Sequence, residues 1–167
     1  MPLRPQVTLK VFYKWEIDSV GPINPPTKRS GARYIITTAK YLTILEEASP
    51  VKYCSVETAT HFLFEQVITR FGCPRILVSD QDTHFINSNI KDMTEEFEFY
   101  HQKITPYHPQ ENRIVESFNK IIENELTNIC NINMDDWDLK IPAVFWVYRT
   151  ICKKLTGKKP LILVYGK

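Results

Sequence analysis

Hydrophobic and polar residues alternate along residues 12–20, where Trp15 and Ile17 share one parity and polar side chains separate them. This period of two predicts a β-strand with one better-buried face. The turn-rich segment GPINPPTKRSG follows at residues 21–31. Residues 32–51 are rich in Tyr, Ile and Thr, and they predict two further strands.

The hydrophobic period becomes helical after residue 55. Ser55 is a suitable N-cap for this helix, and Gly72 ends the pattern. The apolar run PRILVSD at residues 74–80 then predicts a buried strand. Residues 87–100 predict a short helix, and residues 101–105 predict another short strand.

Two long helical patterns follow. Residues 111–129 predict a long amphipathic helix, and residues 134–152 predict a second one despite Pro142, whereas residues 157–167 are expected to form a loop. The apolar stripe of the first helix comprises Val115, Phe118, Ile122, Leu126 and Ile129. The aromatic residues expected in the core are Trp137, Trp146 and Tyr148.

The order of these elements is three strands, helix, strand, helix, strand and helices, which predicts a mixed α/β sheet with helices packed on it. A chain of 167 residues, 43% of them hydrophobic, is sufficient for one globular domain. Its apolar runs are all much shorter than the roughly 20 residues of a membrane span, so no membrane partner is expected. The four cysteines are scattered without a CxxC pair, which argues against a zinc site and a disulfide framework.

Three acidic residues stand where such a sheet can build a metal site. Asp18 and Asp80 end two predicted strands, and ligands of open α/β sheets gather beyond the carboxyl ends of strands. Glu116 lies on the long helix, opposite its apolar stripe. Converging carboxylates can hold two Mg²⁺ ions about 4 Å apart, an arrangement that activates water or a hydroxyl at phosphorus. Spacing alone is equally compatible with solvated surface acids, because the chain has 19 acidic residues.

Longer motifs decide between these two interpretations. They are KWEIDSVGPI (14–23), FGCPRILVSDQDTHF (71–85), TPYHPQENRIVES (105–117), DWDLKIPAVFWVYRT (136–150) and LVYG (163–166). In these stretches the chain closely resembles the integrase catalytic core of gypsy-type long-terminal-repeat retrotransposons, which share a fold with retroviral integrases. Asp18, Asp80 and Glu116 match the D, D, E pattern of that family, and residues 81–115, 35 in all, give its usual spacing.

The resemblance implies a ribonuclease-H-like fold, with a mixed five-stranded sheet flanked by helices. It also implies a polynucleotidyl transferase that trims DNA 3′ ends and joins them to target DNA. Asp18, Asp80 and Glu116 are then the catalytic residues and the ligands of two Mg²⁺ or Mn²⁺ ions. Residues expected to bind DNA are His108, Gln110, Asn112, Asn119 and Lys120. A homodimer or larger multimer acting in the nucleus is expected on the same grounds.

Some of these residues have open alternatives. Lys120 suits a phosphate contact, whereas Asn119 is expected to contact either DNA or the Glu116 carboxylate. His108 is equally compatible with a turn residue. We expect an extended leader at residues 1–10, the catalytic core at 11–150 and a basic C-terminal tail at 151–167.

Two other functions stay open. Asp82, Glu111 and Arg113 stand where glycine is usual, and Lys40 stands where Asp is common. The three replaced glycines favour a non-catalytic or domesticated nucleic-acid-binding remnant of an integrase, whereas the three intact acids argue against one. A ribonuclease acting on RNA–DNA hybrids shares the fold, but the TPYHPQ and LVYG stretches argue against it.

Overall fold

The computed structural model describes residues 13–41, 43, 45–79, 88–103, 113–130, 132, 134–150 and 157–166.

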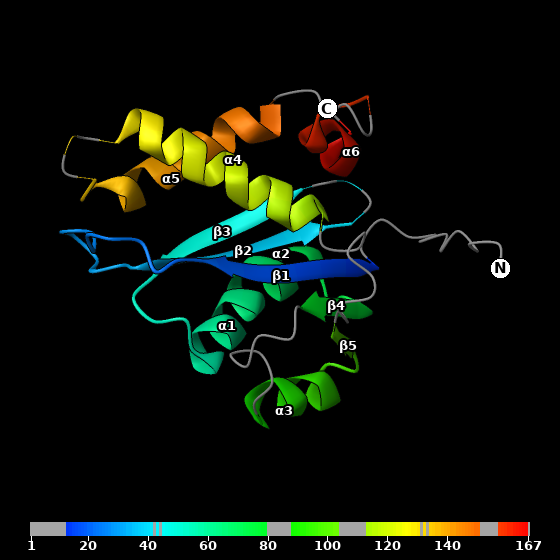
Figure 1. Cartoon of the computed structure of the whole chain (residues 1–167). Coiled ribbons are helices and arrows are strands. Elements are labelled where there is room, and N and C mark those ends of the chain that lie inside the picture. The colour runs from blue at the N-terminus through cyan, green and yellow to red at the C-terminus, as the bar shows by residue number, and fades with distance from the viewer. Residues whose placement is uncertain are drawn as a thin grey trace, which may run out of the picture.

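A mixed sheet lies at the centre of the molecule (Figure 1). Among the described residues it has five strands in the order β3-β2-β1-β4-β5. The strands are β1 (Lys14–Val20), β2 (Tyr34–Lys40), β3 (Glu46–Val51), β4 (Ile76–Ser79) and β5 (Tyr100–Lys103). The β1–β2 and β2–β3 pairs are antiparallel, whereas β1–β4 and β4–β5 are parallel. The predicted mixed five-stranded sheet is thus confirmed.

Helices cover both faces of this sheet, as Figure 1 shows. One face carries α3 (Ser88–Glu96) and the helical run of α1 (Val56–Phe62), η1 (Leu63–Ile68) and α2 (Thr69–Phe71). The other carries α4 (Arg113–Ile129) and α5 (Trp137–Thr150). Because β1 is central, even its polar residues Lys14 and Glu16 are buried, at 7% and 2% exposure. The prediction of a single better-buried face was therefore wrong for this strand.

Each face has its own hydrophobic core. Trp15 and Ile17 of β1 belong to a cluster with residues of α1 and α3. Ile35 of β2 belongs to a second cluster, in which α4 contributes Phe118 and Ile122. Burying each such side chain stabilises the fold by about 1.5–3 kcal/mol. The α4 cluster fixes which side of that helix faces the sheet.

Local sequence features account for the helix ends. Ser55 Oγ accepts a hydrogen bond from Thr58 N at the start of α1, and Gly72 ends α2 with a φ of 83°, as the sequence predicts. The π-helical segment η1 was not predicted.

Three predictions about the α4–α6 region were wrong. Trp146 is 67% exposed and Ile129 is 41% exposed, so neither is a core residue, although Trp137 and Tyr148 are buried as predicted. Pro160–Tyr165 forms α6 rather than a loop. Pro160 lies in its first turn and Gly166 closes its C-terminus with a φ of 69°, two features that favour a short helix. Within the described ranges, no helix is long and apolar enough to cross a membrane.

Candidate functional site

The candidate site begins at the carboxyl end of β1. Ile17 of β1 pairs with Ser79 of β4 in parallel register, so the two strands run to the same edge of the sheet. Asp18 follows Ile17 and is half-buried. Asp80 follows Ser79 in the sequence and lies outside the described residues, as do His108, Gln110 and Asn112.

Helix α4 brings Asn119 to Asp18. Asn119 Nδ2 donates a hydrogen bond of 2.8 Å to Asp18 Oδ2, and Ser19 N donates one of 2.7 Å to Asp18 Oδ1. Asn119 Oδ1 accepts a hydrogen bond of 2.9 Å from Thr37 Oγ1 of β2. The sequence suggested a contact of Asn119 with DNA or with Glu116, and the contact with Asp18 was not anticipated.

A cavity of about 380 Å³ lies beside this contact. It is lined by Ser19, Val20, Gly21, Glu116, Asn119, Lys120 and Glu123. Glu116 and Lys120 are exposed. They lie on the solvent side of α4, whereas Phe118 is buried on the side that faces the sheet. The structure therefore brings Glu116, Asn119 and Lys120 together next to the end of β1.

The chemistry of this site suits a hard cation and a phosphate. Carboxylate oxygens, such as those of Asp18 and Glu116, are the protein ligands that Mg²⁺ prefers. Each carboxylate has about four acceptor positions, so one N–H bond on each Asp18 oxygen is compatible with metal ligation. Within the described ranges, which omit Asp80, no group of three His, Cys, Asp or Glu residues is close enough to hold a metal ion.

Ser79, the residue before Asp80, is held by β5. Ser79 Oγ lies 2.8 Å from His101 Nε2. Burial lowers the pKa of His101, and the nearby Lys103 charge lowers that pKa further. The contact between Ser79 and His101 ties the end of β4 to β5, and no motif in the sequence pointed to it.

Comparisons with known proteins agree with this architecture. The chain is 24% identical over 156 residues to the Retrovirus-related Pol polyprotein from transposon 412 of Drosophila melanogaster, covering 93% of this chain and 12% of that protein. It is 28% identical over 142 residues to the Pro-Pol polyprotein of Simian foamy virus type 3, covering 85% of this chain and again 12% of the relative. The chain thus spans about an eighth of these relatives. No family model matches it.

Solved structures give the same result for the fold. The catalytic core domain of BIV integrase superposes with a TM-score of 0.69 at 15% identity, over 91% of this chain and 93% of that one. A chain of the simian T-cell lymphotropic virus intasome, solved in complex with a PP2A regulatory subunit, gives a TM-score of 0.74 at 16% identity, over 92% and 54%. The chain has the fold of an integrase catalytic core. Its homologues are Pol polyproteins of retrotransposons and retroviruses.

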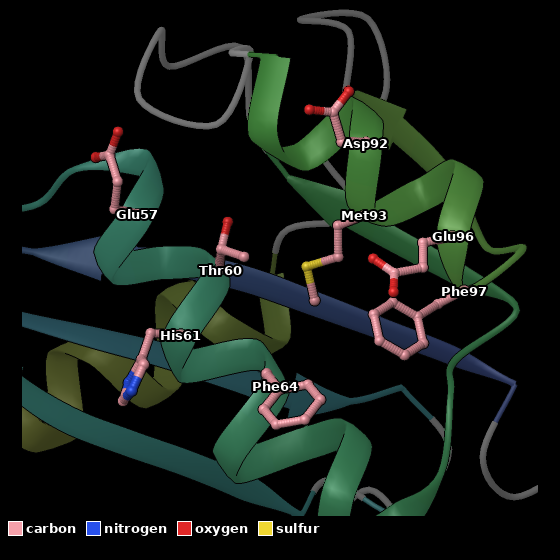
Figure 2. A pocket seen from close by; sticks show the side chains of 8 residues that line it. All are labelled: Glu57, Thr60, His61, Phe64, Asp92, Met93, Glu96 and Phe97. Carbon is pink, nitrogen blue, oxygen red and sulfur yellow. The ribbon is translucent and has the colours of Figure 1, made fainter.

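In this integrase fold, a second cavity of about 490 Å³ lies on the opposite face of the sheet from α4 (Figure 2). Its lining residues are Glu57, Thr60, His61, Phe64, Asp92, Met93, Glu96 and Phe97. The Phe64 and Phe97 rings lie 6.2 Å apart, and Met93 points into the space between the helices. His61 lies at the exposed edge of this cavity, 3.4 Å from Glu65 Oε1. None of the lining residues belongs to the Asp18 site.

The integrase fold also contains buried charges toward the other end of the β1–β2 pair. Lys40 pairs with Trp15 in register and is fully buried, with Nζ 3.8 Å from the centroid of the Phe71 ring. Burial lowers the pKa of Lys40 to about 7, although the Glu47 charge acts in the opposite direction. The surroundings of Lys40 indicate a structural role away from the Asp18 site.

Glu46 and Glu47 connect this buried region to α5. Tyr148 Oη donates a hydrogen bond of 2.6 Å to Glu46 Oε1, while Arg149 Nη2 lies 2.7 Å from Glu47 Oε2. Burial raises the pKa of Tyr148, and the Glu46 carboxylate raises it further. These contacts attach the C-terminal half of α5 to the edge strand β3.

Proposed function

We propose that this chain is the catalytic core of a gypsy-type retrotransposon integrase. In this proposal it is a metal-dependent polynucleotidyl transferase that processes DNA 3′ ends and transfers them to target DNA. The observation that carries the proposal is the hydrogen bond between Asn119 and Asp18, because it brings Glu116 on α4 next to the carboxyl end of β1. The integrase-core fold and the Pol homologues support it.

The ligands in this proposal are Asp18, Asp80 and Glu116, holding two Mg²⁺ or Mn²⁺ ions. Bound ions of this kind activate a water or a 3′ hydroxyl and stabilise the leaving oxygen. The chain's own contribution is to orient Asp18 through Asn119 and to present Lys120 to a DNA phosphate at the same cavity. His108, Gln110 and Asn112 remain proposed DNA contacts.

The proposed assembly is a homodimer or larger multimer on DNA in the nucleus. Leu139, Trp146 and Val147 of α5 are 50%, 67% and 49% exposed, and they share the side of that helix away from its buried residues Val144 and Tyr148. Large apolar side chains gathered on one helix face are typical of a protein interface. We propose that this α5 face, defined by Leu139, Trp146 and Val147, packs against a second copy.

The second candidate function is a non-catalytic nucleic-acid-binding remnant. One of the departures that favour it has a simple structural account. Arg113 begins α4, and a right-handed helical backbone suits arginine better than glycine. Asp82 and Glu111 lie outside the described residues.

Metal-dependent stability tests the proposed function. We would titrate Mn²⁺ into the full chain and follow the melting temperature, comparing it with Glu116→Gln and the control Glu125→Gln. Glu125 is an exposed acid of the same helix that does not line the cavity. A concentration-dependent rise, lost in Glu116→Gln and kept in Glu125→Gln, is expected because a ligand that binds only the folded state stabilises it. The absence of any rise in the unaltered chain would make the remnant the better conclusion.

A further inference from the structure

Thr37 is fully buried on β2 and lies directly opposite Asp18 in the antiparallel β1–β2 pair. Its hydroxyl oxygen lies 2.9 Å from Asn119 Oδ1 and 3.4 Å from the backbone oxygen of Asp18. The shorter of these contacts is the better hydrogen bond. Thr37, Asn119 and Asp18 therefore form a continuous series of side-chain contacts from β2 through α4 to β1.

The Asn119 amide is held between two partners, the Thr37 hydroxyl and the Asp18 carboxylate. An asparagine amide has a donor end and an acceptor end of almost the same shape. Thr37 donates to Oδ1, and the Nδ2 donor faces Asp18 Oδ2 at 2.8 Å. The reversed amide would place Oδ1 against the carboxylate, where two acceptors repel each other. The carboxylate thus selects the amide orientation, and the Thr37 hydroxyl holds the amide in it by donating to Oδ1.

We propose that Thr37 is a positioning residue of the metal site, which acts on Asp18 through Asn119. The inference rests on the proposed function, since it assumes that Asp18 is a metal ligand. Hydrogen-bonding partners behind a ligand fix its direction, and removing one typically weakens metal affinity by about 10–100-fold. Thr37 comes from a strand that carries none of the proposed ligands, so the D, D, E pattern gives no indication of it.

The variants that test this role differ by single groups. Thr37→Val replaces the hydroxyl with a methyl of similar size, Thr37→Ser keeps the hydroxyl and Thr37→Ala leaves the space open. Thr38→Val is the matched control. Thr38 is the next residue of β2, is equally buried, and donates a hydrogen bond of 2.6 Å to the backbone oxygen of Glu16. Thr38→Val therefore removes a buried hydrogen bond on the opposite face of the sheet from Thr37.

The first readout is the apparent Kd for Mn²⁺ from melting temperatures of the full chain. Thr37→Val is expected to weaken Mn²⁺ binding by about 10-fold or more, and Thr37→Ser is expected to restore it. Thr38→Val is expected to melt at a lower temperature with unchanged Mn²⁺ affinity. Should Thr37→Val fail to fold, Thr37→Ala carries the same expectation. Unaltered affinity in Thr37→Val or Thr37→Ala would overturn this inference while leaving the proposed function intact.

The second readout needs no metal. The side-chain amide signals of Asn119 in a nitrogen–proton NMR spectrum, assigned by their loss in Asn119→Ala, report whether the amide is held. They are expected to shift and exchange faster with solvent in Thr37→Val but to stay in place in Thr38→Val. Unchanged signals in Thr37→Val would overturn the inference. A chain without any Mn²⁺ response would overturn the proposed function, and the metal-positioning role of Thr37 with it, even if the amide signals shifted as expected.

Discussion

Asn119 donates a hydrogen bond of 2.8 Å to the Asp18 carboxylate, although the two residues are 101 positions apart in the chain. The contact joins α4 to the carboxyl end of β1. Glu116 lies one helical turn before Asn119 and lines the cavity beside it. The position of Glu116 relative to Asp18 therefore depends on how α4 packs on the sheet.

Replacing Asn119 with Asp tests this contact by charge. Asn119→Asp places a second carboxylate against Asp18, and at about 4 Å such a pair is expected to lower stability by about 1–4 kcal/mol at neutral pH. Thermal melts at several pH values measure the loss. The loss of stability is expected to become smaller as the pH falls, because protonation of either carboxyl removes the repulsion. It is also expected to become smaller when Mn²⁺ is added. A loss that is the same at every pH would show that charge is not its cause.

Removing the positive charge of Lys120 tests the proposed phosphate contact. Lys120→Ala is expected to weaken binding of duplex oligonucleotides and to reduce the slope of log K against log salt concentration by about 1, because one fewer counterion is released. Fluorescence polarisation over a series of KCl concentrations measures this slope. Lys91→Ala is the control, since Lys91 is an exposed lysine of α3 on the other face of the sheet. Equal slopes in both variants would contradict the contact.

The buried amine of Lys40 predicts a pH-dependent contribution to stability. Its pKa falls from 10.5 to about 7 on folding, so between these values the unfolded chain binds a proton that the folded chain does not. The free energy of unfolding therefore rises with pH across this window. Lys40→Met is expected to lack the rise, so its stability relative to the parent is greatest below pH 7 and declines toward pH 10. Denaturant unfolding at pH 6, 8 and 10 measures the difference in free energy of unfolding between Lys40→Met and the parent. A difference that is the same at all three pH values would indicate a purely steric effect and contradict the prediction.

The exposed α5 face predicts self-association. Trp146→Glu places a charge in the middle of this face and is expected to shift the chain toward monomer. Sedimentation velocity at several protein concentrations measures the distribution. Asn124→Glu, at an exposed position of α4, is expected to leave it unchanged. A parent chain that is monomeric at every concentration would rule out the proposed α5 interface.

Local pattern was sufficient for most of the secondary structure. Alternation predicted β1, the Ser55 cap and Gly72 delimited the α1–α2 run, and helical spacing placed Phe118, Ile122 and Leu126 on the buried side of α4. The hydrophobic pattern did not predict burial correctly where burial depends on whether another element packs over the residue. Trp146 and Ile129 are large apolar residues of the kind found in cores, but they are 67% and 41% exposed.

The sequence by itself determined the order of strands and helices, the mixed sheet and the three acids of the D, D, E pattern, because these follow from local periodicity and from motifs read along the chain. Only the tertiary structure decided that Asn119 contacts Asp18, that Thr37 donates a hydrogen bond to Asn119 and that Lys40 is buried beside Phe71. Each of these contacts joins elements distant in sequence. Their geometry is set by the crossing of α4 over β1 and by the burial of both sheet faces, which no local pattern encodes.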